Sequence, residues 1–157
     1  MVVTTTPAAA HHSAAGVVVT SPAGEVLMVH THNRGRDSLV LPGGVVEYGE
    51  APAVAAEREV TEELGLQLRV TRLLVMQHKP ALEGGPGSLM FVFDSPSIRR
   101  DTALVLQPEE VAAVFWLDPD SAVTRHTEAG QARLRAALEA RRDGRTIYMD
   151  ADRVLPG

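Results

Sequence analysis

The sequence predicts an α/β domain in which a mixed β-sheet is sandwiched between helices. Short runs rich in β-branched residues, such as Val17–Val19 and Val111–Leu117, have the composition of strands. Two longer stretches, 51–64 and 128–142, consist mostly of helix-forming residues, and each ends near a glycine. Because strands precede and follow both helices along the chain, a sheet covered on both faces is the expected architecture.

The first part of the domain is expected to contain three strands. Val17–Val19 and Glu25–His30 flank the turn sequence Ser21-Pro22-Ala23-Gly24, which predicts two antiparallel strands joined by a short loop. Ser38–Leu41 is a further short strand that stops at Pro42-Gly43-Gly44. Two adjacent glycines after a proline let the backbone turn sharply and come close to another group.

The helix predicted over 51–64 has a signal at each end. Pro52 suits the first turn of a helix, where its missing N–H has no partner to lose, and Gly65 stands where a C-terminal cap belongs. The remaining elements are expected to be strands over 67–77, 88–93, 111–117 and 146–149 and a second helix over 128–142.

The length of the chain, 157 residues, corresponds to about one domain. Residues 1–15 are small, polar and rich in alanine, and we expect them to form a flexible N-terminal segment. Residues 16–157 are expected to form a single domain, since the chain contains neither an internal repeat nor a dividing linker.

Composition excludes several classes of function. The chain has no cysteine, which removes disulfides, cysteine zinc sites and thiol catalysis. The net charge of −5, with fourteen arginines and one lysine, argues against a nucleic-acid-binding face. No apolar run approaches the roughly 20 residues that span a bilayer, and no secretory signal is recognisable. The expected location is therefore the cytoplasm, with no membrane partner.

The spacing of three glutamates on the first predicted helix indicates a candidate metal site. Glu59, Glu62 and Glu63 are spaced i, i+3, i+4, so they share one side of the helix. Like charges at this spacing repel one another, and the negative end of the helix dipole adds to the cost. A bound Mg²⁺ or Mn²⁺ ion would reverse both effects. The alternatives are a solvated acidic face and a surface for docking another protein.

Neighbouring residues favour the metal site. A free carbonyl of Gly43 or Gly44 could fold back over the helix and join the carboxylates. Arg58 lies one turn before Glu62 and could hold that carboxylate or Glu50 with its planar, two-pronged guanidinium. The alternative is that Arg58 and Glu62 form an ordinary surface ion pair, which has the same i, i+4 spacing.

The segment 44–66 resembles the Nudix box, G-x5-E-x7-R-E-U-x-E-E-x-G-U, in which U is a bulky aliphatic residue. Every specified position of this 23-residue pattern is matched. The matching residues are Gly44, Glu50, Arg58, Glu59, Val60, Glu62, Glu63, Gly65 and Leu66. The preceding Leu41-Pro42-Gly43 is also the usual lead-in of the family, and the similarity in strand order extends over roughly residues 15–150.

The resemblance implies a Nudix fold and a Mg²⁺- or Mn²⁺-dependent pyrophosphohydrolase. Such an enzyme cleaves a nucleoside diphosphate linked to another moiety X, by attack of water on phosphorus. Metal-bound carboxylates suit this reaction, which needs charge neutralisation and in-line positioning. By likeness, the metal ligands are Glu59, Glu62, Glu63 and the carbonyl of Gly43, the catalytic residues are Glu59, Glu62 and Arg58, and Gly44, Glu50 and Glu110 support the site.

The resemblance leaves other questions open. The general base is a glutamate of the box or a distant one, for which Glu109 and Glu110 are the candidates. The substrate-binding residues and the identity of X are not indicated. Many members pair, so a homodimer is an expectation. The rival functions are a non-catalytic nucleotide-binding domain of the same fold and an isoprenoid diphosphate isomerase, which usually uses a cysteine that this chain lacks.

Overall fold

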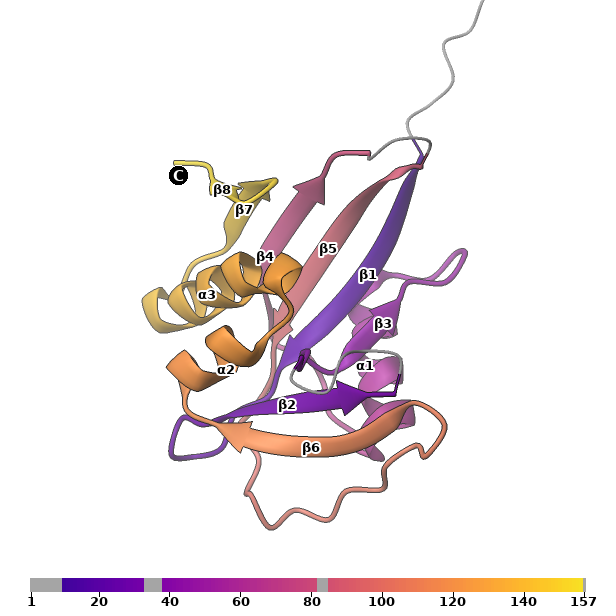
Figure 1. Ribbon diagram of the computed structural model, residues 1–157, viewed down its shortest axis with the longest axis vertical. Helices are drawn as coiled ribbons and strands as arrows, with labels where there is room; N and C mark the ends of the chain where they lie inside the picture. The colour runs from indigo at the N-terminus through magenta and orange to yellow at the C-terminus, as the bar shows by residue number, and fades with distance from the viewer. Residues whose placement is uncertain (1–9, 33–37, 82–84, 157) are drawn as a thin grey trace, which may run out of the picture.

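Two β-sheets and three helices make up the computed structural model, which describes residues 10–32, 38–81 and 85–156 (Figure 1). The strands are β1 (His11–Val18), β2 (Val26–Thr31), β3 (Gly43–Val45), β4 (Arg72–Lys79), β5 (Gly87–Asp94), β6 (Val111–Leu117), β7 (Ile147–Asp150) and β8 (Arg153–Val154). The helices are α1 (Pro52–Leu64), α2 (Pro119–Arg125) and α3 (Glu128–Asp143). None of these helices is long and apolar enough to cross a membrane.

Within these residues, the larger sheet has six strands in the order β3-β1-β5-β4-β7-β8. Strand β1 runs parallel to β5 and antiparallel to β3, and β4 runs parallel to β7 and antiparallel to β5, so the sheet is mixed. Strands β2 and β6 form a separate antiparallel pair. Helix α1 lies on one side of the large sheet, and α2 and α3 lie on the other (Figure 1).

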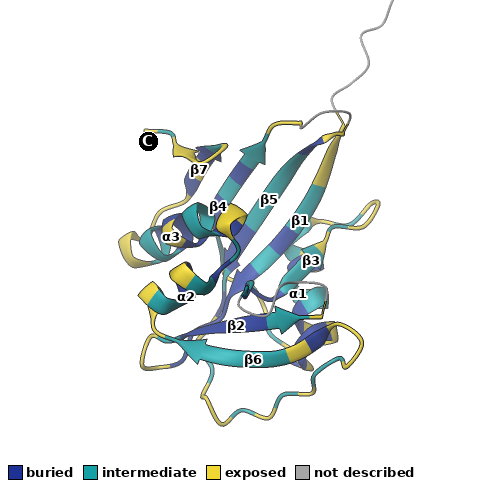
Figure 2. Ribbon diagram, in the orientation of Figure 1, coloured by how far each residue is buried: buried dark blue, intermediate teal, exposed yellow. Residues whose placement is uncertain are grey.

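The alternation of side chains along β1 and β2 builds a core on each side of the sheet. Val17 and Leu27 pack with Val60 and its neighbours on the α1 side. Val18 and Met28 pack with the α2 and α3 side, where the buried residues include Leu134 and Ala137. Successive residues of a strand point to opposite faces, so the end of β1 at Val17 and Val18 and the first four residues of β2 are buried on both sides (Figure 2). The predicted mixed sheet between helices is confirmed.

Several predicted elements are confirmed with small changes of boundary. Strand β6 has the predicted bounds, and α1 and α3 differ from prediction by one residue at one end. Strand β4 begins at Arg72 rather than at residue 67. Helix α2 was not predicted, although Asp118 caps it by accepting the N–H of Ser121 at 3.0 Å and Pro119 opens it.

The predicted antiparallel pairing of the first two strands is confirmed only beside the turn. Thr20 and Val26 form an antiparallel bridge, the N–H of Leu27 donates to the carbonyl of Val19 at 2.9 Å, and the N–H of Ser21 donates to the carbonyl of Glu25 at 2.8 Å. Beyond this point β1 and β2 belong to different sheets. The predicted strand Ser38–Leu41 is reduced to isolated bridges of Leu39 and Val40, and the regular strand follows at Gly43–Val45. A short turn and β-branched residues favour a strand, but they do not specify which partner it pairs with.

Strand β1 overlaps the end of the N-terminal segment predicted over residues 1–15. Strand β1 begins at His11, because residues 11–15 pair with β5, and Ala14 and Ala15 also pair with β3. Residues 1–9 lie outside the described part of the chain, so a flexible segment there stays a prediction.

Gly43 has the tightest fit of the glycines at the edge of the large sheet. Its φ of +146° is one that L side chains rarely adopt, and an added Cβ would lie 2.2 Å from the carbonyl oxygen of Ala15 and 2.6 Å from Cα of Gly16. Both atoms belong to the backbone of β1 and cannot move aside cheaply. Gly49 also has a positive φ, +77°, but a Cβ there would meet nothing within 4 Å.

We expect Gly43→Ala to lower the free energy of unfolding by more than Gly49→Ala does. A strained backbone conformation costs roughly 1–3 kcal/mol, and only Gly43→Ala adds a clash with β1. Urea unfolding of the two variants beside the parent chain measures the difference. Equal losses of stability in the two variants would show that the contact with β1 does not require a glycine.

Candidate functional site

Helix α1 carries the acidic residues and is held in place by its apolar side. Ala56, Val60 and Leu64 are buried, and Glu63 lies on the same buried side. The helix ends at Gly65, whose φ of +66° is left-handed and whose N–H donates to the carbonyl of Thr61 at 2.9 Å. Packing of the apolar residues against the sheet therefore directs Glu59 and Glu63 toward β3.

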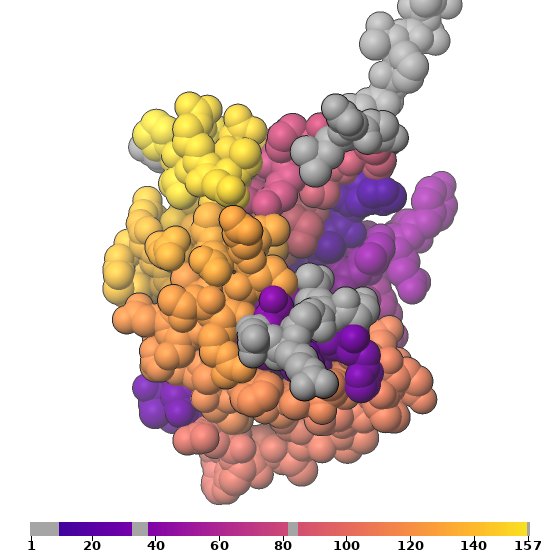
Figure 3. Space-filling view, in the orientation of Figure 1, coloured from indigo at the N-terminus to yellow at the C-terminus, as the bar shows by residue number. Residues whose placement is uncertain are grey.

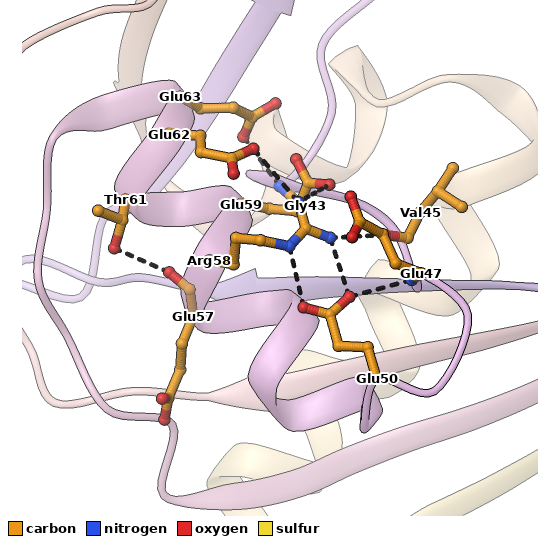
Figure 4. Close-up of polar contacts among 10 residues, drawn as sticks. All are labelled: Gly43, Val45, Glu47, Glu50, Glu57, Arg58, Glu59, Thr61, Glu62 and Glu63. Carbon is orange, nitrogen blue, oxygen red and sulfur yellow. Dashed lines mark hydrogen bonds and ion pairs between the residues drawn. The ribbon is translucent and has the colours of Figure 1, made fainter.

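The guanidinium of Arg58 joins three carboxylates and one carbonyl (Figure 4). Its Nε and Nη2 donate to the two carboxylate oxygens of Glu50, at 2.9 and 3.0 Å. Its Nη1 donates to Glu59 at 2.9 Å and to Glu62 at 3.2 Å, and Nη2 also donates to the carbonyl of Val45 at 3.0 Å. One side chain thus fixes the loop before α1 and the end of β3 against the helix.

Two glycines form the opposite wall of the site. The N–H of Gly43 donates to Oε2 of Glu63 at 2.9 Å. The carboxylate of Glu59 lies so close to Gly44 that a Cβ there would be 2.4 Å from its Oε1. The backbone of β3 therefore approaches both carboxylates directly, and any side chain at position 44 would displace Glu59.

A cavity of about 430 Å³ opens beside this wall. Its lining residues are Thr31, His32, Val40, Gly43, Gly44, Val45, Glu59, Glu63, Glu109 and Glu110. Glu109 and Glu110, the candidates for a general base outside the helix, thus line the same cavity as Glu59 and Glu63 of the helix. Glu62 is not among the lining residues, and its side chain is half exposed beside Arg58.

Main-chain hydrogen bonds tie the segment that carries Glu109 and Glu110 to the site. The N–H groups of Val105 and Gln107 donate to the carbonyls of Leu64 and Glu63, at 2.9 and 3.0 Å. These are carbonyls of the last turn of α1, which have no partner within the helix. The N–H of His32 donates to the carbonyl of Glu110 at 3.0 Å, which joins the segment to the end of β2.

Burial and charge perturb the carboxylates in different directions. Only 3% of the surface of Glu63 is exposed, and burial raises its pKa to about 7. The hydrogen bond from the Gly43 N–H lowers this pKa, and the charges of Glu59, Glu110 and Glu62 raise it. Burial also raises the pKa of Glu59, against the opposing effect of Arg58. The hydrogen bonds from Arg58 lower the pKa of Glu50. Negative charge on Glu59 and Glu63 is therefore disfavoured by their burial in the cavity.

A hard divalent cation fits this donor set in charge and in ligand type, because carboxylate and carbonyl oxygens are its preferred ligands. Across the described residues, no three carboxylate or histidine side chains are already gathered around one point as metal ligands would be. Glu59 and Glu62 are instead hydrogen-bonded to Arg58, and Glu63 to Gly43. The burial of Glu63 also argues against the alternative of a fully solvated acidic face.

A second cavity, of about 390 Å³, shares Val40 and the segment 43–45 with the first. It extends between β1, β5 and the start of α3, and its lining includes Lys79, Phe91, His126 and Arg133. The sequence did not single out these residues for the site. They come from separate elements, and no local motif relates them.

Comparison with known proteins gives the family. The model of the NUDIX domain matches residues 10–138. A MutT-like protein of Streptomyces ambofaciens is 33% identical over 124 residues, which cover 79% of this chain and 74% of that protein. The NAD-capped RNA hydrolase NudC of Photorhabdus laumondii is 36% identical over 99 residues, which cover 60% of this chain but only 34% of that protein.

Among solved structures, the MutT protein of Methanosarcina mazei superposes with a TM-score of 0.68. The alignment covers 88% of this chain and 99% of that one at 17% identity, so it supports the shared fold. The fold, the complete sequence motif on α1 and the match over residues 10–138 agree: the chain belongs to the Nudix hydrolase family.

Proposed function

We propose that the protein is a Mg²⁺- or Mn²⁺-dependent hydrolase that cleaves the pyrophosphate bond of a nucleoside diphosphate linked to a moiety X. Nudix proteins generally use a divalent metal and act on small nucleotide substrates. The observation that carries the proposal is the meeting of Glu59 and Glu63 with the Gly43-Gly44 backbone in one cavity. The relative NudC, which is a hydrolase of NAD-capped RNA, is consistent with this chemistry over the matched region.

The proposal gives each residue of the site a role. The metal ligands are Glu59, Glu62, Glu63 and the carbonyl of Gly43, with Glu62 approaching from its exposed position. The bound metal would neutralise charge on the phosphates and activate water. Glu110, which lines the same cavity, would take a proton from the attacking water. Arg58 and Glu50 hold the loop and the helix in register, and Gly44 leaves room for the carboxylate of Glu59.

The activity is tested with a panel of nucleotide pyrophosphates, including nucleoside triphosphates, ADP-ribose, dinucleotides and nucleotide sugars. The expected result is cleavage of the diphosphate bridge that requires Mg²⁺ or Mn²⁺, with phosphate-containing products identified by mass spectrometry. Tight binding of a panel member without cleavage would instead favour the non-catalytic ligand-binding domain.

Glu63→Gln is expected to remove one contribution to the pH dependence of stability and to abolish stabilisation by metal. A carboxyl whose folded pKa is raised stabilises the fold below its unfolded pKa of about 4.5 and loses that contribution as the pH rises through about 7. Without metal, the variant should therefore gain stability relative to the parent chain between pH 5 and pH 8, by roughly 1–3 kcal/mol. Millimolar Mg²⁺ should raise the melting temperature of the parent chain but not of the variant.

Thermal melts in EDTA and in Mg²⁺ measure both effects. Glu57→Gln is the matched control, because Glu57 lies on the same helix and bonds with Arg69 and the N–H of Val70, away from the cavity. A Glu63→Gln variant that keeps the full metal-induced rise would remove Glu63 from the ligand set.

Arg58→Lys separates a positioning role from a substrate-binding role. An ammonium cannot reproduce the two parallel hydrogen bonds to Glu50, so the loop and the carboxylates should lose their register. Loss of such a supporting group typically costs about 10–100-fold in metal affinity or activity. We expect weaker metal binding and a lower kcat, with little change in KM.

Metal titration and steady-state kinetics check this prediction. Arg69→Lys serves as the control, since Arg69 bonds with Glu57 at 3.0 Å and is largely exposed. Unchanged metal affinity together with a raised KM would mean that Arg58 contacts the substrate phosphates instead.

A further inference from the structure

The two adjoining cavities are lined by ionisable side chains of opposite charge. The acidic cavity is lined by four glutamates, and His32 is its only basic residue among the described ones. The second cavity is lined by Lys79 and Arg133, and none of the described residues that line it is acidic. Val40 and the segment 43–45 line both cavities, so the two adjoin, and together they are named the cleft. In a chain with a net charge of −5, the single lysine thus stands in this cleft.

Both cations are held in place by the surrounding structure. Nζ of Lys79, at the end of β4, donates to the carbonyl of Ala129 at 3.0 Å. Nη1 of Arg133, on α3, donates to Oε1 of Gln77 at 2.6 Å, and Gln77 is fully buried. The two side chains therefore reach the cavity from neighbouring elements that the fold fixes relative to each other.

The C-terminal hairpin of β7 and β8 supports this arrangement. Nε2 of Gln77 donates to the carbonyl of Ala151 at 2.7 Å and to Asp152 at 3.2 Å, and both residues lie in the turn of the hairpin. Figure 3 shows the hairpin packed beside α3. Asp152 also lies 3.8 Å from Nζ of Lys79, but it is largely exposed and does not line the cavity. The buried side-chain amide of Gln77 thus holds Arg133 in its place at the wall of the second cavity.

An apolar stretch separates the acidic wall from the two cations. Met90, Phe91 and Val92 of β5 line the second cavity together with Ala14 and Ala15 of β1. A ligand that spans the cleft would meet carboxylates at one end, an apolar wall in the middle and cations at the other. A metal-bound pyrophosphate matches the first of these regions, and a second anionic group matches the last.

We propose that Lys79 and Arg133 select substrates that carry an anionic group in addition to the pyrophosphate, such as a carboxylate or a further phosphate on X or on the nucleoside. This inference rests on the proposed function for the placement of the pyrophosphate. Charge-assisted hydrogen bonds to a carboxylate or a phosphate are about twice as strong as neutral ones, so the two cations distinguish the charged compound from its neutral counterpart.

The test compares matched pairs that differ in one anionic group, UDP-glucuronate with UDP-glucose and NADP⁺ with NAD⁺. Dissociation constants are measured by calorimetry with Ca²⁺ in place of Mg²⁺, so that a hard cation is available to the carboxylates and the readout does not depend on turnover. We expect the charged member of at least one pair to bind about tenfold more tightly. Lys79→Met and Arg133→Met should each bring that ratio close to one.

Arg135→Met is the control, because Arg135 lies on α3 but lines a different cavity, and it should leave the ratio unchanged. Equal affinities within both pairs, or a preference that survives both substitutions, would overturn the inference. Metal-dependent hydrolysis is measured separately with the wider panel, so the inference can fail while the proposed function stands. A charge preference without any hydrolysis would contradict only the proposed function.

Discussion

Strand β3 lies so close to β1 on one side and to the carboxylates of α1 on the other that positions 43 and 44 have no room for a side chain, and the site depends on that constraint. Gly43 faces the backbone of β1, where a Cβ would lie 2.2 Å from a carbonyl oxygen, and Gly44 faces the carboxylate of Glu59 at a comparable distance of 2.4 Å. Because β3 comes this close on both sides, its N–H reaches Glu63 and its last carbonyl reaches Arg58. The same contact brings a buried carboxylate next to the cavity, where its charge is costly to leave uncompensated.

The sequence predicted the parts of the fold that depend on local chemistry. Pro52 and Gly65 mark the ends of α1, and the left-handed φ at Gly65 is the reason that a glycine stands there. The partners of the strands depend on contacts between residues far apart in the chain, which is why the pairing of β2 with β6 was missed. Helix α2 had a local signal in Asp118 and Pro119 that was overlooked.

In the candidate site too, features set by local spacing were predictable and features set by packing were not. The spacing of Glu59 and Glu63 on one helix was enough to predict that they lie together, and Arg58 was predicted to hold a neighbouring carboxylate. The spacing did not show that Glu63 would be buried while Glu62 stays half exposed, because that depends on which side of α1 packs against the sheet. Lys79 and Arg133 lie 54 positions apart in the sequence, and only the packing of α3 against β4 brings them to one cavity.

The backbone bonds from Val105 and Gln107 to the end of α1 have a consequence for how the chain can vary in length. The segment leading to β6 acts as a main-chain cap for the helix, so its residue count sets where Glu109 and Glu110 stand relative to Glu63. Insertions or deletions between 105 and 111 would shift those carboxylates out of the cavity whatever side chains were chosen. The turn near Arg99–Thr102, which makes no such bonds to α1, is the place where this connection can lengthen without moving the site.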